Sequence, residues 1–249
     1  MKKIENGTIT NVKGIKATGI SAGLKNSGKK DLALIYSEGK AVCAGVFTKN
    51  LAKAAPILID MEHIKNENTQ AIVVNSGNAN SCTGEKGLIN AKKMAEIVAK
   101  KFELKTEEVL VQSTGIIGVQ LNMDKIENGI DKAMQSLDET GGLDAATAIM
   151  TTDTFVKQIC YEFEIDGRKV TIAGMAKGSG MIHPNMATML SFTITDVNIE
   201  KSLLQKMFLE VADNTFNMIS VDGDTSTNDM ACVLANGLSE NEKIVNENS

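Results

Sequence analysis

A two-residue turn at Asp166-Gly167 constrains the fold most, because it separates two segments of strand-forming residues at positions 156–165 and 169–173. Turns of this composition join neighbouring antiparallel strands and match their right-handed twist. The pattern therefore predicts a β-hairpin at this point of the chain. A fold that contains it has at least one antiparallel strand pair.

A second hairpin is predicted nearer the N-terminus, where Glu38-Gly39-Lys40 separates apolar runs at residues 31–37 and 41–48. Further apolar runs predict strands at residues 71–75, 109–111, 189–197 and 230–235. Apolar side chains at helical spacing predict helices at residues 86–102, 123–137, 145–150 and 200–216. This irregular alternation is typical of a layered α/β or α+β domain with mixed, largely antiparallel sheets.

The composition argues against several classes of partner. The chain has 249 residues and a net charge of −5, from 26 basic and 31 acidic side chains. A nucleic-acid surface would need clustered Lys and Arg instead. No segment approaches the roughly 20 apolar residues of a membrane span, and no apolar signal segment follows the first residues. We therefore expect a soluble, cytoplasmic protein with no nucleic-acid or membrane partner.

Cysteine and histidine are too widely spaced to predict a metal centre or a Cys–His pair. The cysteines Cys43, Cys82, Cys160 and Cys232 have apolar or small neighbours, which favours reduced, buried thiols. His63 falls in a polar helical patch and is expected on the surface. An enzyme of this composition has to find its catalytic base elsewhere.

Two polar, glycine-bearing stretches adjoin predicted strands, at residues 75–84 and 220–229. Their small polar side chains predict loops outside the core, which bind either their own backbone or a polar ligand. A third polar stretch, Ser113-Thr114-Gly115, ends the strand that begins at residue 109. A glycine N–H can be approached closely and a hydroxyl adds a second donor. Thr114 and Gly115 are therefore candidates for an oxyanion hole.

Residues 174–192 lie between two predicted strands and combine Lys177, a Gly-Ser-Gly turn and the pair Ala187-Thr188. A hydroxyl at the mouth of a strand, beside a glycine-rich turn and a lysine, is a common way to present a nucleophile. Thr188 is therefore our candidate nucleophile, and the alternative is a plain hairpin with a long loop. Lys177 would pair with a substrate carboxylate or lower a neighbouring pKa, or else be a solvated surface lysine.

An N-terminal threonine would supply the missing base. Its α-amino group has a pKa of about 7.7–8.0 and is partly neutral near pH 7. Thr188 would gain such a group if the bond to Ala187 were cut. The Thr188 hydroxyl can attack the Ala187 carbonyl and give an ester that water hydrolyses. The glycines of 178–180 and the pair His183-Pro184 would supply the turn that distorts this peptide.

The segment Lys177-Gly-Ser-Gly-Met-Ile-His-Pro-Asn-Met-Ala-Thr188-Met-Leu resembles the self-cleavage motif of the ArgJ family, the glutamate N-acetyltransferases also called ornithine acetyltransferases. Stretches similar to that family also occur at residues 45–50, 75–80, 82–84, 113–115 and 221–225. The resemblance implies a DmpA/ArgJ-like layered fold of the N-terminal-nucleophile type. It also implies cleavage between Ala187 and Thr188 into an α chain, residues 1–187, and a β chain that begins with residues 188–249.

The same resemblance implies a reaction in arginine biosynthesis. Thr188 would take the acetyl group of N2-acetylornithine and pass it to glutamate through an acetyl-enzyme. Acetyl-CoA as a second donor is left open. No metal or prosthetic group is implied, and a hetero-oligomer of α and β chains is expected.

The family's site residues can be carried over by position. Thr114 and Gly115 match its oxyanion hole, while Lys177, Thr188 and Thr151 match substrate-binding positions. The register of the last position is ambiguous, because Thr152 and Thr154 lie next to Thr151.

The family's β chain continues well beyond residue 249, so we expect a C-terminally truncated copy whose own activity is open. Two further interpretations stay in view. An N-terminal-nucleophile amidohydrolase or aminopeptidase would use the same Thr188 but pass the acyl group to water. A remnant that only binds small molecules or partners would keep the fold without the reaction.

Overall fold

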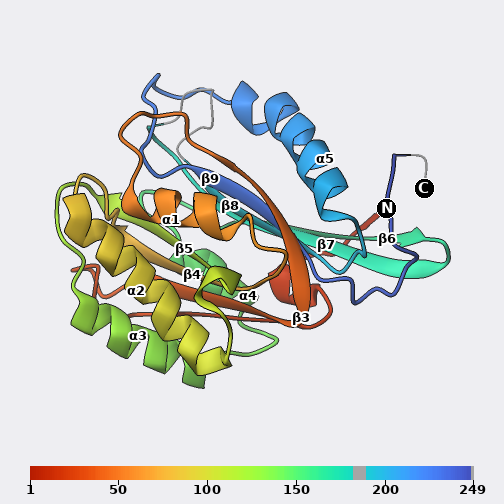
Figure 1. Cartoon of the computed structure of the whole chain (residues 1–249), viewed down its shortest axis with the longest axis horizontal. Helices are drawn as coiled ribbons and strands as arrows, with labels where there is room; N and C mark the ends of the chain where they lie inside the picture. The colour runs from red at the N-terminus through yellow and green to blue at the C-terminus, as the bar shows by residue number, and fades with distance from the viewer. Residues whose placement is uncertain (182–188, 248–249) are drawn as a thin grey trace.

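The structure is a computed structural model that describes residues 1–181 and 189–247 of the chain (Figure 1). The strands are β1 (Lys2–Lys3), β2 (Ile15–Ile20), β3 (Leu32–Phe47), β4 (Thr69–Asn78), β5 (Val109–Ile116), β6 (Lys157–Ile165), β7 (Arg168–Lys177), β8 (Leu190–Thr195) and β9 (Met230–Ala235). The helices are α1 (Ala55–His63), α2 (Gly84–Phe102), α3 (Met123–Gln135), α4 (Gly142–Ala148) and α5 (Lys201–Asn214).

The strands form two sheets that share the long strand β3. The first half of β3 pairs with β2 and β4, and β4 pairs with β5. Its second half pairs with β9, which continues through β8, β7 and β6 to β1. The pairs β4–β5 and β8–β9 are parallel and the other pairs between these strands are antiparallel. The predicted layered α/β class with mixed, largely antiparallel sheets is confirmed.

The predicted hairpin at Asp166-Gly167 is confirmed. These two residues have φ values of 51° and 73°, and Ile165 pairs directly with Arg168 across the turn. Positive φ at both central residues is the requirement of the two-residue turn that follows the twist of its strands. The strand after the turn, β7, ends at Lys177.

The predicted hairpin at Glu38-Gly39-Lys40 is wrong. These residues lie inside β3, where the register against β4 shifts between Tyr36 and Ala41. A tight turn here would need a left-handed residue, whereas Gly39 is not among the residues with positive φ. The strand runs on because both of its halves find partners, β2 and β4 before the irregularity and β9 after it.

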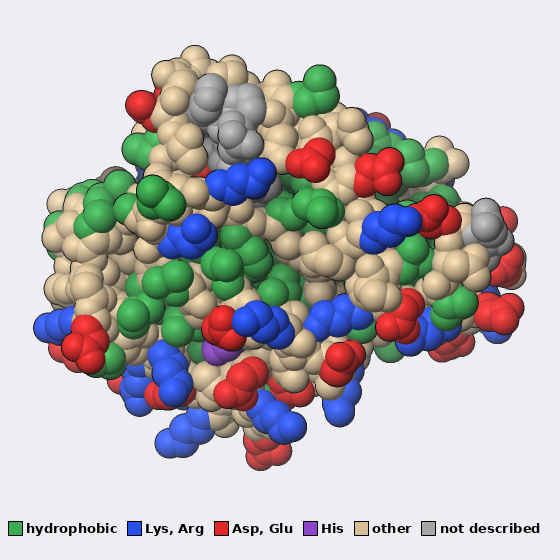
Figure 2. All heavy atoms as spheres, turned by 45° about the horizontal axis from the view of Figure 1, so that its top comes forward, with side chains coloured by type: hydrophobic (Ala, Val, Ile, Leu, Met, Phe, Trp, Pro, Cys, Tyr) green, Lys and Arg blue, Asp and Glu red, His purple; other side chains and the backbone are tan. Residues whose placement is uncertain are grey.

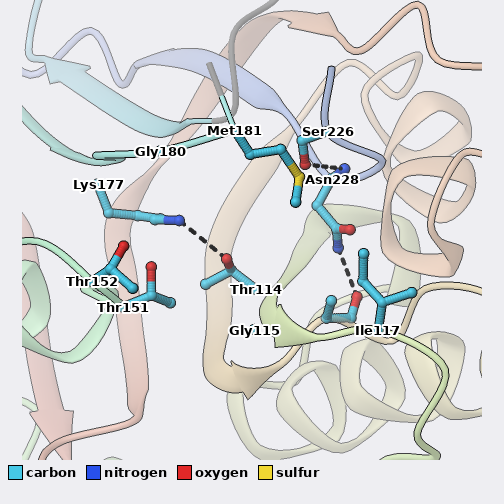
Figure 3. A pocket seen from close by; sticks show the side chains of 11 residues that line it. Thr114, Gly115, Ile117, Thr151, Thr152, Lys177, Gly180, Met181, Ser226 and Asn228 are labelled. Carbon is cyan, nitrogen blue, oxygen red and sulfur yellow. Dashed lines mark hydrogen bonds between the residues drawn. The ribbon is translucent and has the colours of Figure 1, made fainter. Parts of the chain in front are cut away.

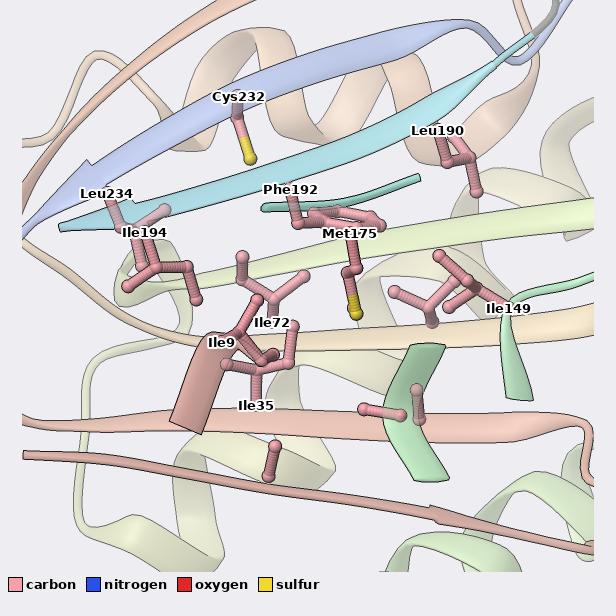
Figure 4. Close-up of a cluster of buried hydrophobic side chains, with 14 of the residues drawn as sticks. Ile9, Ile35, Ile72, Ile149, Met175, Leu190, Phe192, Ile194, Cys232 and Leu234 are labelled. Carbon is pink, nitrogen blue, oxygen red and sulfur yellow. The ribbon is translucent and has the colours of Figure 1, made fainter. Parts of the chain in front are cut away.

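The main core lies between the two sheets (Figure 4). Ile35 and Ile72 face it from one sheet, while Met175, Phe192 and Leu234 face it from the other. Each of these side chains is almost fully removed from water, which stabilises the fold by roughly 1.5–3 kcal/mol per large apolar side chain. The core therefore fixes how the ends of the two sheets stand relative to each other.

Helices cover the outer faces of both sheets. Helix α2 turns Ala91, Met94 and Val98 onto the outside of β3, β4 and β5, and α3 packs beside it. Helix α5 places Leu203 and Leu204 against β3 and β9 on the opposite side. The order of layers is helix, sheet, sheet, helix (Figure 1).

The surface carries both signs of charge. Figure 2 shows lysine and arginine side chains interspersed with acidic ones over the face in view. Pairs such as Lys16–Glu38, at 2.6 Å, are exposed and contribute little to stability. Within the described residues, no helix combines the length and the apolar character needed to cross a bilayer.

Candidate active site

A pocket of about 400 Å³ opens where β5 and β7 end (Figure 3). Cavities of this size hold small organic molecules. Its walls come from five separate parts of the chain: Ala79, Thr114, Gly115, Ile117, Thr151, Thr152, Lys177, Gly180, Met181, Ser226 and Asn228. Four residues singled out from the sequence, Thr114, Gly115, Thr151 and Lys177, therefore lie together around one cavity.

Lys177 is the last residue of β7 and points into this pocket. Its side chain reaches Thr114 of β5, with Nζ donating to Oγ1 at 3.2 Å. The residue is only 5% exposed, so the interpretation as a solvated surface lysine is wrong. Burial lowers the pKa of Lys177, while the carboxylates of Asp153 and Asp229 act in the opposite direction.

Gly115 sits where no larger residue fits. Its φ is +135°, and a Cβ built there would lie 2.3 Å from the carbonyl carbon of Gly77 on the neighbouring strand. Only glycine takes up such a φ without strain. The parallel pairing of β4 with β5 places Gly77 directly opposite Gly115. The lack of a side chain at Gly115 therefore lets β4 and β5 lie close together beside Thr114.

The expectation that residues 75–84 form a loop outside the core is wrong. Strand β4 includes residues 75–78, and several side chains of the stretch are buried. Asn75, Ser76, Asn80 and Ser81 are fully buried. Their side chains find partners inside the protein: Asn75 Oδ1 accepts from the Ser113 hydroxyl at 2.5 Å, and the Ser76 hydroxyl donates to the Ala148 carbonyl. Polar groups that are hydrogen-bonded in this way can be buried at little cost. The bond between Asn75 and Ser113 holds the end of β4 to the end of β5.

Asn228, in the polar stretch 220–229, is hydrogen-bonded to the end of β5. Its Nδ2 donates to the Ser113 carbonyl at 2.8 Å and to the Ala79 carbonyl at 2.6 Å. The Asn228 N–H donates in turn to the hydroxyl of Ser226 at 3.0 Å. Ser226 and Asn228 thus form one wall of the pocket beside Thr114 (Figure 3).

Asp153 fixes the side of the pocket that Thr151 and Lys177 line. Its Oδ1 accepts from the N–H of Gly178 at 2.8 Å and forms an ion pair with Lys157, while its Oδ2 accepts from the N–H of Thr151 at 3.2 Å. Burial alone would raise the pKa of Asp153, but these hydrogen bonds outweigh it and the pKa is lowered. The ionised carboxylate fixes Thr151 and the backbone that follows β7. Thr151 and Thr152 both line the pocket, and Thr154 is not among its lining residues.

Asp229 precedes β9 and is 1% exposed. Its Oδ1 accepts from the N–H of Met189 at 3.1 Å, just before β8 begins. Burial raises the pKa of Asp229 to about 7, against the opposing effects of the Ser226 hydroxyl, the Met189 N–H and the charge of Lys177. Two buried ionisable groups of opposite charge, Lys177 and Asp229, thus act on each other at this end of the sheet.

Comparison with known proteins identifies the family. The sequence profile of the ArgJ family matches residues 16–248. The chain belongs to the ArgJ family. It is 57% identical to the arginine biosynthesis bifunctional protein ArgJ of Caldanaerobacter subterraneus over 97% of its own length and 60% of that protein. Against ArgJ 1 of Clostridium acetobutylicum the identity is 55%, over 100% of this chain and 61% of that protein. The chain thus spans about 60% of the length of these relatives.

Several solved structures share the fold of this chain. The ArgJ protein of Bacillus halodurans is 45% identical with a TM-score of 0.71, covering 74% of this chain and 97% of that one. The ornithine acetyltransferase of Mycobacterium tuberculosis, solved with ornithine, is 37% identical with a TM-score of 0.67 and the same coverage. An aminopeptidase of Ochrobactrum anthropi, described as a variant of the Ntn hydrolase fold, has a TM-score of 0.53 at 13% identity, over 92% of this chain and 73% of that one. The implied fold of the N-terminal-nucleophile type is therefore confirmed.

Ala187 and Thr188, the expected cleavage site and nucleophile, lie outside the described residues. Before that segment, Gly180 and Met181 line the cavity, and after it the N–H of Met189 donates to Asp229. The strands that follow and precede the segment are neighbours, since Lys177 pairs with Leu190.

The histidine His63 and the four cysteines do not line the pocket. His63 is buried, not on the surface as expected, and its Nδ1 lies 2.7 Å from the carbonyl oxygen of Val109. Cys43, Cys160 and Cys232 are buried as expected, but Cys82 is exposed. Among the described residues, no cluster of three or more His, Cys, Asp or Glu side chains could hold a metal ion.

Sequence reasoning missed Asn228 and Asp229. The only signal was that both belong to the polar stretch 220–229, which gave no hint of which residues face inward.

Proposed function

We propose that this chain carries the catalytic centre of a self-cleaving acetyltransferase, which moves the acetyl group of N2-acetylornithine to glutamate in arginine biosynthesis. Its ArgJ membership supports this reaction class. The observation that carries the proposal is the hydrogen bond from buried Lys177 to Thr114, beside Gly115, in a pocket that is also lined by Gly180 and Met181, the last described residues before the segment that contains Thr188.

In the first step, the Thr188 hydroxyl attacks the carbonyl carbon of Ala187. The C–N bond breaks, the amide nitrogen leaves with a proton, and an ester remains that water hydrolyses. Residues 1–187 then form the α chain, and the β chain begins at Thr188 with a free α-amino group. That amine is the base for the later steps, because its pKa of about 7.7–8.0 leaves part of it neutral near pH 7.

In the transfer, the Thr188 hydroxyl attacks the acetyl carbonyl of N2-acetylornithine and ornithine leaves with a proton. The amine of glutamate then attacks the acetyl-threonine ester and regenerates the hydroxyl. Thr114 and Gly115 stabilise the oxyanion in each step. The ammonium of Lys177 donates to the Thr114 oxygen, which leaves the Thr114 proton free to point at the oxyanion and makes it a stronger donor.

The pocket also suits amino-acid substrates. Lys177 is a positive charge in a buried wall, where it can pair with the α-carboxylate of acetylornithine or glutamate. Thr151 supplies a hydroxyl on the same side. Acetyl-CoA as a second donor belongs to this proposal too, because the same acetyl-threonine would form from it.

Cleavage would leave the two pieces associated in one sheet. Strand β8 pairs with β7 on one side and with β9 on the other, and β9 pairs with β3. The β-chain strands thus lie between two strands of the α chain. Separating the pieces would break both ladders and expose Phe192 and Leu234 of the core. We therefore propose a tightly bound pair of α and β chains.

Intact mass measurement of the purified chain over time tests the proposal. The expected result is conversion of the 26.6 kDa chain into two pieces that split at Ala187–Thr188 and together gain one water. Thr188→Ala should stay whole. Thr193→Ala is the matched control, because it removes a hydroxyl from β8 at a position that does not line this pocket, and it should split normally.

Product analysis then separates transfer from hydrolysis. Incubation with N2-acetylornithine should add an acetyl group to the piece that begins at Thr188. Addition of glutamate should give acetylglutamate rather than acetate. Free acetate with or without glutamate would contradict the transferase and favour an amidohydrolase.

A further inference from the structure

Strand β5 is the last strand of its sheet, and side chains bind the backbone along its open edge. The Val111 N–H donates to the carboxylate of Asp60 at 2.8 Å, and the Ser113 carbonyl accepts from Asn228 Nδ2 at 2.8 Å. Backbone groups of successive strand residues point to opposite sides, so every second residue shares one edge. Gly115, two residues after Ser113, therefore directs its N–H to the same edge, at the pocket.

The side-chain amide of Asn228 bridges the ends of β4 and β5. Its two N–H groups donate to the carbonyls of Ser113 and Ala79, at 2.8 and 2.6 Å. Its Oδ1 accepts from the hydroxyl of Thr227 at 2.6 Å, and that oxygen accepts in turn from Ser81 at 2.8 Å. These bonds fix which end of the amide is nitrogen, because backbone carbonyl oxygens can only accept.

The loop that carries Asn228 is held in place on both sides of this residue. The Ala54 N–H donates to the carbonyl of Thr227 at 2.9 Å, and the Thr48 N–H donates to the carbonyl of Asp229 at 2.9 Å. Asn228 itself is buried. A side chain whose backbone and partners are fixed in this way can hold a neighbouring group in one geometry. The end of β5 is thus bonded to a rigid donor.

We propose that Asn228 is a positioning residue for the proposed oxyanion hole. The Ser113 carbonyl that it binds belongs to the peptide that leads into Thr114, so the amide fixes the backbone from which the Thr114 hydroxyl and the Gly115 N–H project. Oxyanion donors act fully only when they are held about 3 Å from the place where the charge develops. The inference rests on the proposed function, which gives these donors their task.

The same bond would connect the two chains of the cleaved protein. Asn228 lies in the part that would become the β chain, whereas Ser113, Thr114 and Gly115 lie in the part that would become the α chain. The oxyanion hole of one chain would then be held in shape by a side chain of the other. The alternative is that Asn228 only covers the edge of β5.

Asn228→Asp tests the inference, because a carboxyl has the shape of the amide but donates one hydrogen bond when protonated and none when ionised. Burial raises the pKa of such a carboxyl, so its donor is lost as pH rises. Acetyl transfer from N2-acetylornithine to glutamate is measured at saturating substrates from pH 5.5 to 8.5. Each rate is divided by the wild-type rate, because Lys177 and Asp229 act in both proteins. This ratio should fall by about 10-fold to 10²-fold as pH rises, with little change in KM.

Asn236→Asp is the matched control. Asn236 follows the other end of β9, is likewise buried, and donates through Nδ2 to the Lys13 carbonyl at 2.9 Å and the Ser37 hydroxyl at 3.3 Å. It does not line the pocket. The control gains the same kind of buried carboxyl, so it shares any pH-dependent loss of folded protein. Circular dichroism measures the folded fraction at each pH, and the corrected rate of the control should equal the wild-type rate throughout.

Amide hydrogen exchange provides a second measurement that needs no catalysis. It is made in a Thr188→Ala background, where every sample stays in one piece, and mass spectrometry follows peptides that contain residues 113–116. At pH 8, Asn228→Asp should speed exchange in these peptides by about 10-fold, which corresponds to the loss of one hydrogen bond. Asn236→Asp should leave exchange in the same peptides unchanged.

The possible outcomes separate the inference from the proposed function. If Asn228→Asp transfers acetyl at the wild-type rate, or is slowed by the same factor at every pH, the inference is overturned and the proposed function survives. Unchanged exchange at residues 113–116 overturns it as well. If the wild-type chain transfers no acetyl group, the proposed function fails and the catalytic role of Asn228 fails with it. The exchange result then still decides whether Asn228 fixes the end of β5.

Discussion

Removing the carboxyl of Asp229 should change how stability depends on pH, whether or not the chain is an enzyme. The comparison is best made in a Thr188→Ala background, where every sample stays in one piece. In that background Asp229→Asn is compared with intact Asp229. The substitution keeps the acceptor for the Met189 N–H and removes one titration.

The sign and size of this pH dependence follow from the raised pKa of Asp229. Between the ordinary value of 3.8 and about 7, the folded protein holds a proton on Asp229 that the unfolded chain has lost. The free energy of unfolding therefore falls as pH rises through this window, by about 1.4 kcal/mol per pH unit. The free energy of unfolding falls by about 4 kcal/mol over the whole window, of which about 2 kcal/mol is lost between pH 5 and 7. Above pH 7 the loss levels off.

Urea unfolding at 25 °C, repeated from pH 5 to 8, measures the effect. The difference in unfolding free energy, variant minus parent, should rise by about 2 kcal/mol from pH 5 to 7 and then flatten. The amide nitrogen of Asn adds a buried donor that lacks a partner, which shifts the whole difference curve by about 1–3 kcal/mol without changing its slope.

Asp138→Asn provides the contrast. Hydrogen bonds from Thr140 lower the pKa of this exposed carboxyl, so its contribution is fully present above the ordinary value and is lost only at more acidic pH. Its difference curve should be flat from pH 5 to 8. If the unfolding free energies of Asp229→Asn and its parent change in parallel with pH, the claim that burial raises the pKa of Asp229 is refuted.

Three further substitutions probe the pocket. Thr114→Ala should slow self-cleavage and acetyl transfer together, by about 10²-fold each, since one oxyanion hole would serve both; a loss of only one activity would contradict a shared hole. Gly115→Ala should lower Tm well beyond the effect of Gly118→Ala, because both have positive φ but only the first meets the Gly77 backbone at 2.3 Å. Lys177→Met should raise the KM for acetylornithine and reduce kcat, as the Thr114 donor weakens; an unchanged KM would argue against a carboxylate contact.

Local signals in the sequence were sufficient where the chain folds against its immediate neighbours. The β6–β7 hairpin depends on the two positive φ values at Asp166-Gly167, and α2 on an apolar stripe that includes Ala91 and Val98. The pocket residues Thr114 and Lys177 could be singled out because their chemistry is unusual for their surroundings. Their hydrogen bond spans 63 residues of sequence and was beyond the reach of any local pattern.

Where expectation failed, partners distant in sequence decided the outcome. Glu38-Gly39-Lys40 looks like a turn, but β9, almost two hundred residues later, pairs with the second half of β3 and keeps it extended. The polar run from Asn75 looks solvated, but Ser113 and Ala148 supply its hydrogen bonds from other elements. Composition shows that a group is polar, and only the assembled fold shows whether it is satisfied.

The placement of the proposed cleavage site explains why a broken chain could keep a rigid pocket. Positions 187 and 188 fall between two adjacent strands of one sheet, and the ladder from Lys177–Leu190 to Ile172–Thr195 holds β7 and β8 together without the connecting peptide. Leu190 pairs on its other side with Met230, next to Asp229. Lys177 and Asp229 are therefore positioned by strand pairing that cleavage does not touch. A cut at this point would free an amine and leave the groups around it in place.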